Sequence, residues 1–193
     1  MQKFNRTLGV ALAVALLVTM APVVQAGDQS WEELDQASKR AKIDETAGKT
    51  LNDVLSENEK AQDLYDKAYG WAAFDNLKIA FGFSGGGGNG VAVNKQTGNR
   101  TYMKMGSAGV GIGIGGKKYQ VLFLFQDEQT FRNFVDKGWK ADAQAGAQAG
   151  GSGAAAQTDF VNGIAVYQIS DKGLIASADV SGTKYWKNDK LNE

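Results

Sequence analysis

The sequence contains no cysteine and no histidine among its 193 residues, and its only proline is Pro22. Without histidine there is no histidine-based catalytic triad, and without cysteine there is no thiol nucleophile. An ordinary zinc site is excluded too, because such sites draw mainly on these two residue types. Carboxylates remain as candidate acids and bases, but most fall in expected helices or turns and are interpreted as solvated surface. The sequence therefore predicts a protein that is not an enzyme, with no catalytic residue, metal site or cofactor.

The first 26 residues have the pattern of a secretory signal peptide. Lys3 and Arg6 precede an apolar run at residues 8–20, and a small-residue cleavage site ends at Ala26. Cleavage is therefore expected between Ala26 and Gly27, and the absence of cysteine excludes a lipoprotein. We expect a periplasmic or secreted protein, placed peripherally at a membrane if it binds lipid.

The charge balance argues against one class of partner. Removal of 26 residues from 193 would leave 167, which is enough for one domain that needs no disulfide or metal. The same removal takes away Lys3 and Arg6 and leaves 19 basic residues against 21 acidic ones. This slightly negative balance argues against nucleic-acid binding. Any anionic partner must therefore meet a local basic patch.

The stretch from Gly106 to Phe125 is expected at the centre of a sheet. In its first half, glycine alternates with alanine, valine or isoleucine, which is the two-residue period of a β-strand. Its second half, Tyr119–Phe125, is an almost unbroken apolar run, typical of a strand buried on both faces. Lys117 and Lys118 lie between the halves. The stretch is therefore predicted to form the central hairpin of the sheet.

Two glycine patterns resemble nucleotide-binding fingerprints. The motif G-x-G-x-x-G fits Gly85, Gly87 and Gly90, and again Gly111, Gly113 and Gly116. This motif binds a pyrophosphate only when it opens a helix, and strand-like residues follow it in both places. Lys118 also stands where a phosphate-binding loop would need serine or threonine. We therefore predict no nucleotide site.

Helices are expected on either side of the glycine-rich region. Gly27–Ala47 has a polar helical pattern, and Ser56-x-x-Glu59 is a capping box that predicts the start of a second helix. A third helix is expected to begin after Asp127 and to end at Gly138.

The remaining chain predicts about eight short strands, with turns at Gly85–Gly90 and Gln96–Asn99. The expected strands are Trp71–Phe74, Lys78–Ser84, Val91–Asn94, Thr101–Met105, the two halves of the central stretch, an alanine-rich segment at 141–149, and a hairpin of Gly163–Ser170 with Leu174–Ser181. The predicted fold class is α+β, with N-terminal helices packed on a curled, mostly antiparallel sheet. This sheet is sandwich- or barrel-like and has one inserted helix.

A set of spaced glycines and aromatics carries a family resemblance from about Leu64 to Trp186. Its pieces are Ala68-x-Gly70, Phe74, Lys78, Gly85-Gly86, Gly88-x-Gly90, Gly106-x-x-Gly109 with Gly111 and Gly113, Tyr119-Gln120, Phe125, Phe134, and the Lys172-Gly173-Leu174 to Gly182-Thr183 hairpin. This pattern resembles the SYLF domain family, whose eukaryotic members bind phosphoinositides and, in some cases, actin. The resemblance implies a lipid-associated envelope protein without a catalytic residue. The expected organisation is a signal peptide at 1–26, a helical segment at 27–55 and one SYLF-like domain at 56–193.

Two functions from different classes follow. The first is a non-catalytic, lipid-binding protein of the bacterial cell envelope that attaches to anionic phospholipid through surface residues. The candidate residues are Trp31 as an interfacial anchor with Lys39, Arg40, Lys42, Lys49, Lys117 and Lys118. The second is a structural or interaction module whose sheet edge or glycine-rich loops bind an envelope protein. A purely structural interpretation of the six basic residues, as solvated charges, also remains open.

Overall fold

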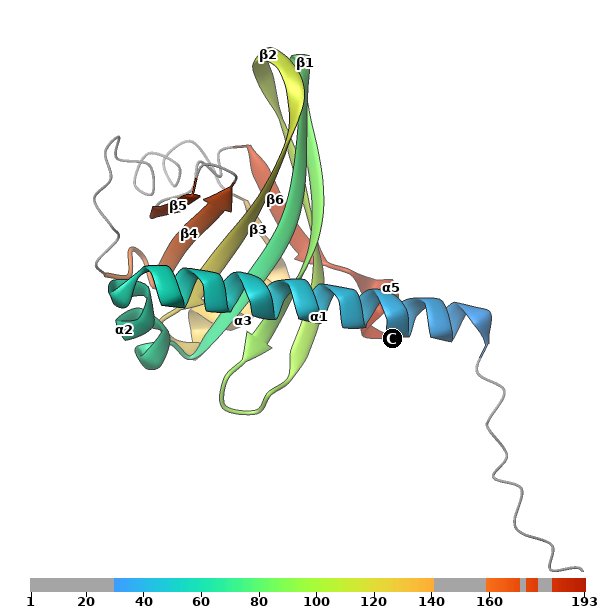
Figure 1. The fold of residues 1–193 in the computed structure, drawn as a ribbon. Coiled ribbons are helices and arrows are strands. Elements are labelled where there is room, and N and C mark those ends of the chain that lie inside the picture. Colours follow the sequence, from blue (N-terminus) through green and yellow to red (C-terminus); the bar gives the residue numbers. More distant parts are fainter. Residues whose placement is uncertain (1–29, 141–158, 171–172, 177–181) are drawn as a thin grey trace, which may run out of the picture.

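The structure is a computed structural model that describes residues 30–140, 159–170, 173–176 and 182–193 (Figure 1). Its elements are α1 (Trp31–Glu57), α2 (Glu59–Lys67), β1 (Gly70–Asn94), β2 (Arg100–Phe125), α3 (Glu128–Lys137), β3 (Trp139–Lys140), β4 (Ile164–Ser170), β5 (Gly173–Ala176), β6 (Thr183–Lys187) and α5 (Asp189–Asn192). The expected signal peptide and the expected strand at 141–149 lie outside the described residues.

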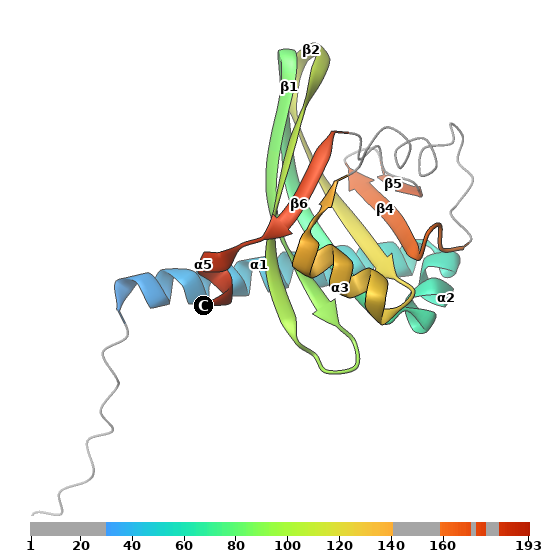
Figure 2. The same ribbon diagram turned by 180° about the vertical axis from the view of Figure 1, so that it is seen from behind.

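One antiparallel sheet contains all six described strands. Their order is β3-β6-β2-β4-β5, and β1 pairs with β2. β6 pairs with β2 over Met103–Ser107, whereas β4 pairs with β2 over Tyr119–Phe125. Helices α1 and α2 cover one side of the curled sheet and α3 covers the other (Figures 1 and 2). The expected α+β class with a curled antiparallel sheet is confirmed.

β1 and β2 form a long ribbon that folds over on itself. Residue pairing runs from Gly70 opposite Phe125 to Val93 opposite Arg100, with one irregularity after Phe81. Figure 1 shows the ribbon rising to an apex and descending again to the β1–β2 turn. The first and second halves of each strand therefore belong to different layers of the curled sheet.

Glycines allow the two halves of β1 to stack closely. A Cβ atom on Gly88 would lie 2.1 Å from Asn76 Oδ1, and one on Gly90 would lie 2.3 Å from the Ala73 carbonyl oxygen. No larger residue fits these positions without displacing the facing strand. The expected turn at Gly85–Gly90 is therefore wrong, because these glycines are strand residues that permit close approach of backbone.

The hairpin expected within Gly106–Phe125 is also wrong. β2 passes through Lys117 and Lys118 as one continuous strand, and its hairpin partner is β1. Pairing with β6 along the first half and β4 along the second keeps both halves extended. The turn expected at Gln96–Asn99 is confirmed, since the Gly98 N–H donates to the Asn94 carbonyl at 2.8 Å.

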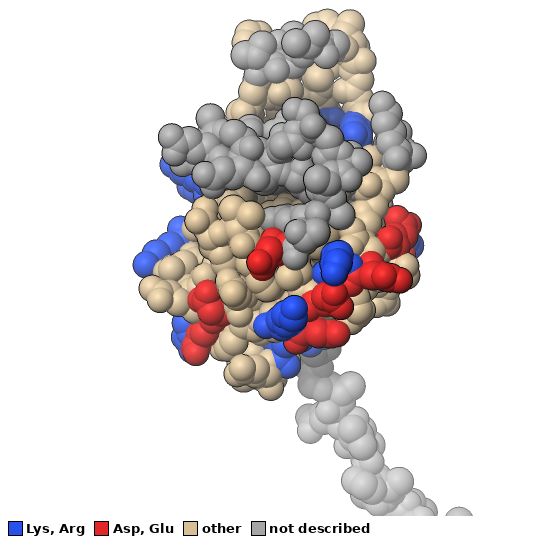
Figure 3. All heavy atoms as spheres, turned by 90° about the vertical axis from the view of Figure 1, so that its left-hand side faces the viewer, with Lys and Arg blue, Asp and Glu red and all other residues tan. Residues whose placement is uncertain are grey.

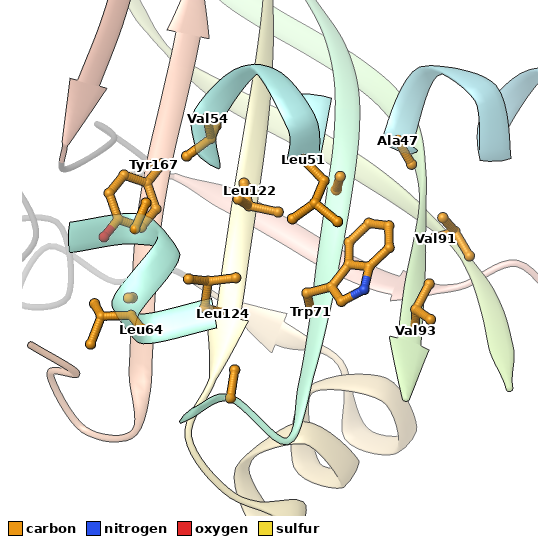
Figure 4. Close-up of a cluster of buried hydrophobic side chains, with 14 of the residues drawn as sticks. Ala47, Leu51, Val54, Leu64, Trp71, Val91, Val93, Leu122, Leu124 and Tyr167 are labelled. Atoms are coloured by element: carbon orange, nitrogen blue, oxygen red, sulfur yellow. The ribbon is translucent and has the colours of Figure 1, made fainter. Parts of the chain in front are cut away.

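Two hydrophobic cores lie on opposite faces of the strands. The inner core is rich in aromatic rings and is closed by α3; its largest members include Phe74, Phe123, Phe125, Phe134 and Tyr185. The outer core lies beneath α1 and α2, and Figure 4 shows Leu51, Val54, Leu64, Trp71, Leu122, Leu124 and Tyr167 meeting there. Alternate residues of β2 enter the two cores, so the prediction that its second half is buried on both faces is confirmed.

The N-terminal helices begin and end differently from expectation. Ser30 caps α1 in a capping box: its Oγ accepts from the Glu33 N–H at 3.2 Å, and the Glu33 carboxylate accepts from the Ser30 N–H. The predicted capping box at Ser56 is wrong, because Ser56 lies in the last turn of α1. Asn58 caps α2 instead, with its Oδ1 accepting from the Ala61 N–H at 3.0 Å.

Candidate functional site

Two predicted basic residues of α1 are paired with acids on the same helix. Lys39 Nζ lies 2.6 Å from Asp35 Oδ2, and Lys49 Nζ lies 2.5 Å from Asp53 Oδ2. Exposed pairs of this spacing contribute only about 0.3–0.5 kcal/mol to stability, so another anion can compete for the lysine. In the free protein, however, each of these lysines faces an acid of opposite charge.

The other predicted residues of α1 lie in different surroundings. Arg40 Nε donates to the Leu191 carbonyl at 3.0 Å, and Arg40 Nη2 donates to Gln36 Oε1 at 3.0 Å. Trp31 is 88% exposed at the start of α1, where the helix extends beyond the sheet (Figure 1). Lys42 lines a cleft. These residues share one helix, whereas Lys117 and Lys118 lie on β2.

The cleft has a volume of about 540 Å³ and lies between α1, the central strands and the C-terminal residues. Its charged lining residues are Lys39, Lys42, Lys104, Lys190, Glu32, Asp35 and Asp75. Asn188 also lines it; this residue is 5% exposed, and among the described residues its Oδ1 has no hydrogen-bond partner. Because four lysines face three acids, the cleft can hold a polar group but has little net preference for an anion.

Lys117 and Lys118 belong to a more strongly basic segment of the ribbon, where they point to opposite faces of β2. Lys78 on β1 lies directly opposite Lys117, and Lys118 lies opposite Leu77. Lys117 and Lys118 are exposed, and Lys78 is half-buried. Like charges directly opposite one another on neighbouring strands are destabilising. We call Lys78, Lys117 and Lys118 the apical lysines.

Beyond Asp75, all charged residues of the β1–β2 ribbon are basic. No acidic residue occurs between Asp75 and Asp127, whereas six basic residues do: Lys78, Lys95, Arg100, Lys104, Lys117 and Lys118. Lys95 Nζ donates to the Tyr65 carbonyl and lies over the Tyr65 ring, and burial lowers its pKa more than Asp66 raises it. Arg100 Nε lies 3.4 Å from Asp44 Oδ1. Because Lys95 and Arg100 are engaged near the β1–β2 turn and Lys104 lines the cleft, the apical lysines are the basic group nearest the apex.

An apolar surface close to the apical lysines was not predicted; Lys118 lies on the same face of the ribbon as this surface, whereas Lys78 and Lys117 lie on the opposite face. Five of the nine exposed large hydrophobic side chains in the described residues belong to this part of the ribbon: Leu77, Ile79, Phe81, Phe83 and Ile114. Sequence alternation from Leu77 to Phe83 does indicate a strand with one apolar face. It does not indicate that this face points to solvent. We call Ile79, Phe81, Phe83 and Ile114 the apical apolar cluster.

Function also depends on whether the described residues contain metal-binding clusters, membrane-spanning helices or side chains with a shifted pKa. They contain no cluster of three or more histidine, cysteine, aspartate or glutamate side chains that could hold a metal ion. None of their helices has both the length and the apolar character needed to cross a membrane. Burial raises the pKa of Tyr167 to about 12 and that of Tyr185 well above its ordinary value, and both residues belong to the hydrophobic cores.

Comparison with known proteins identifies the family. A family model, Ysc84, described as "Las17-binding protein actin regulator", matches residues 106–193. Beta cell expansion factor A of Aeromonas veronii is 41% identical over 174 residues, which cover 88% of this chain and 67% of that protein. The chain belongs to the SYLF (Ysc84) domain family. The resemblance seen in the glycine spacing is thereby confirmed.

SYLF domains are a non-enzymatic family associated with lipid binding and with actin. The residues that match the SYLF model include most of β2 and all elements after it. Lys117, Lys118 and Ile114 therefore lie within the matched region, whereas α1, with Trp31 and Lys39, precedes it.

Proposed function

We propose that this SYLF protein is a non-catalytic lipid-binding protein of the bacterial cell envelope that attaches peripherally to anionic phospholipid. The observation that carries the proposal is the part of the β1–β2 ribbon beyond Asp75, which contains no acid and on which Lys78 lies opposite Lys117, the neighbour of Lys118 in sequence. A basic residue near an anionic surface contributes about 1 kcal/mol, so the three apical lysines support weak and salt-sensitive attachment. The association of SYLF domains with lipid supports the same conclusion.

In this proposal α1 provides a second contact. The exposed Trp31 ring is suited to the interface between headgroups and acyl chains. Lys39, Arg40, Lys42 and Lys49 supply positive charge on the same helix. Because Lys39 and Lys49 already face Asp35 and Asp53, their contribution requires exchange of an internal ion pair for a phosphate.

We further propose a periplasmic or secreted location, with residues 1–26 acting as a signal peptide. The supporting pattern is the basic start, the apolar run and the small residue at Ala26. Mass spectrometry of the intact exported protein should find Gly27 as its first residue. A mature protein that still carries Lys3 would contradict the assignment of residues 1–26 as a cleaved signal peptide, on which the proposed location rests.

Co-sedimentation with vesicles tests the proposed function. The exported protein is mixed with vesicles of pure phosphatidylcholine, or of phosphatidylcholine containing phosphatidylglycerol, at low and high salt. We expect sedimentation only with phosphatidylglycerol, and a loss of binding as salt rises from about 0.05 to about 0.5 M, because the screening length falls to a few ångströms. Equal binding to both vesicle types would contradict attachment through charge.

The alternative, a structural or protein-interaction module of the envelope, is favoured by one feature of the sheet. Among the described strands, the end strands β3 and β5 each pair on one side only. An exposed strand edge can accept a strand from another protein, and such pairing responds weakly to salt. Failure to bind any vesicle would leave this alternative standing.

A further inference from the structure

The apical apolar cluster exposes large side chains at the top of the folded ribbon. The exposed fractions are 57% for Ile79, 73% for Phe81, 80% for Phe83 and 83% for Ile114. Figure 3 shows the apex above the body of the protein. None of the described atoms visible at the apex is coloured red, the colour of Asp and Glu. Exposed apolar patches on soluble proteins usually mark a place where a membrane or another protein binds.

The cluster continues a face of β1 that is buried lower down. Trp71 and Ala73 lie on the same side of the strand as Ile79 and Phe81, because residues two apart share a face. The lower pair is buried beneath α1, whereas the upper pair lies beyond the helix and is exposed. The apolar face of the strand thus extends past the surface that the protein's own helices cover.

We propose that the apical apolar cluster inserts into the interfacial layer of an anionic bilayer while the apical lysines bind its phosphates. This inference rests on the proposed lipid binding and adds the surface that makes the contact and the depth that it reaches.

The order of side chains along the ribbon favours a bilayer as the occupant. Apolar residues occupy the apex, Lys78, Lys117 and Lys118 follow toward the body, and the first acid on β1 is Asp75. A membrane presents the same order of hydrocarbon, anionic headgroup and water. Lysine side chains near an apolar segment extend to the headgroup layer in this way.

The dimensions of the ribbon agree with shallow insertion. Phe81 lies three positions after Lys78, which is roughly 10 Å along a strand. Interfacial elements bury their apolar face to a depth of about 5–10 Å, which is the same scale. β1 pairs with β2 up to Phe81 opposite Ile114, and the pairing resumes at Phe83 opposite Val110. Backbone pairing between the strands is therefore interrupted only at the tip that enters the interfacial layer, where water and headgroups can still bond to free backbone groups.

An anionic surface also resolves the charge arrangement at the base of the apex. Lys78 and Lys117 lie directly opposite each other. A phosphate placed between these two ammonium groups would convert a repulsive pair into two attractive contacts. A neutral apolar partner protein would leave that repulsion in place.

The absence of cysteine from the chain permits a direct test of insertion. Single variants Phe81→Cys and Ile114→Cys are labelled with an environment-sensitive fluorophore, and Gln96→Cys in the β1–β2 turn at the opposite end of the ribbon serves as the matched control. Vesicles contain phosphatidylcholine and phosphatidylglycerol, with or without a nitroxide quencher on the acyl chains. Binding of each labelled protein is measured in parallel by co-sedimentation.

We expect vesicles to blue-shift the emission at positions 81 and 114 and the acyl-chain nitroxide to quench it, with no change at position 96. Sedimentation without a change at positions 81 and 114 would overturn insertion and leave the proposed lipid binding intact. Absence of sedimentation would overturn both. A blue shift that depends on protein concentration without vesicles would instead assign the apex to a contact between copies of the chain.

A second pair of variants measures what the apolar side chains contribute. The double variant Phe81→Ser with Phe83→Ser should weaken vesicle partitioning at least tenfold, because two large apolar side chains would no longer be transferred from water into the membrane. Val161→Ser, which alters an exposed apolar residue outside the apex, should partition as the wild type does. Circular dichroism confirms folding of both. Unchanged partitioning of the double variant would contradict insertion.

Discussion

Lys78 of β1 and Lys117 of β2 lie directly opposite each other across the two central strands, below the exposed apex. This pairing of like charges is unfavourable in the free protein and favourable beside a phosphate. The same two lysines therefore lower the stability of the free protein and favour binding to an anionic lipid. Stability and lipid binding can be measured separately.

Reversal of one charge in this pair should have opposite effects on stability and on binding. Lys117→Glu would place opposite charges across the strands and stabilise the free protein by about 0.2–1 kcal/mol. The same variant should bind phosphatidylglycerol vesicles more weakly. Urea unfolding and co-sedimentation measure the two effects. Lys187→Glu on β6, with the same change in net charge, controls for overall electrostatics, and equal loss of binding in both variants would argue against a specific apical site.

The close stacking of the two halves of β1 predicts a sharp difference between neighbouring glycines. Gly88→Ala would place a methyl group 2.1 Å from Asn76 Oδ1 and 2.4 Å from the Asp75 carbonyl oxygen. We expect it to lower the free energy of unfolding by about 1–3 kcal/mol, the usual effect of overpacking. Gly87→Ala, whose nearest atom is 3.7 Å away, should have little effect. Equal urea midpoints for the two variants would contradict the folded ribbon.

The same substitution should behave differently in the inner core and at the apex. Phe123 is fully buried and its ring packs near those of Phe74, Phe134 and Tyr185. Phe123→Ala should therefore cost about 3–5 kcal/mol of stability. Phe81→Ala removes an exposed side chain and should change stability by less than about 0.5 kcal/mol. Chemical denaturation distinguishes the two, and a large loss for Phe81→Ala would mean that the apex is packed in solution.

Two core tyrosines predict loss of stability in alkaline solution. Burial raises the pKa of Tyr167 to about 12 and that of Tyr185 well above the ordinary value of 10.0. The unfolded chain therefore loses these protons first, so stability is complete below pH 10 and falls as the pH rises toward 12. Each group contributes a slope of up to about 1.4 kcal/mol per pH unit in that range. Unfolding of wild type and Tyr167→Phe between pH 9 and 11 should show a shallower slope for the variant, and equal slopes would contradict the shift.

Several elements could be predicted because local signals and tertiary burial agree. Asp127 accepts from the Thr130 N–H at 2.8 Å and Gly138 ends α3, as the capping residues indicate. The apolar run of Tyr119–Phe125 is buried on both faces. The β4–β5 pair around residues 171–172 is likewise confirmed within its described part.

Other features depend on contacts that are distant in the sequence. A glycine run is compatible with a turn or with close stacking of strands, and only the approach of Asn76 to Gly88 distinguishes them. Alternation shows that Ile79 and Phe81 share a face. Whether that face is buried depends on α1, which covers its lower part and leaves these two residues exposed. By contrast, the pairing of Lys39 with Asp35 follows from their spacing of four residues on a helix and could have been predicted.

The central claim, attachment to anionic phospholipid through the apical lysines, is tested most directly by one vesicle titration. Wild type, the double variant Lys117→Glu with Lys118→Glu, and the triple variant of Lys39, Arg40 and Lys42 to Glu are compared as the phosphatidylglycerol fraction increases. We predict that the double variant loses binding at every composition and that the triple variant loses less, because Lys39 and Arg40 are already engaged within the chain. Binding of the double variant equal to that of the wild type would contradict the claim.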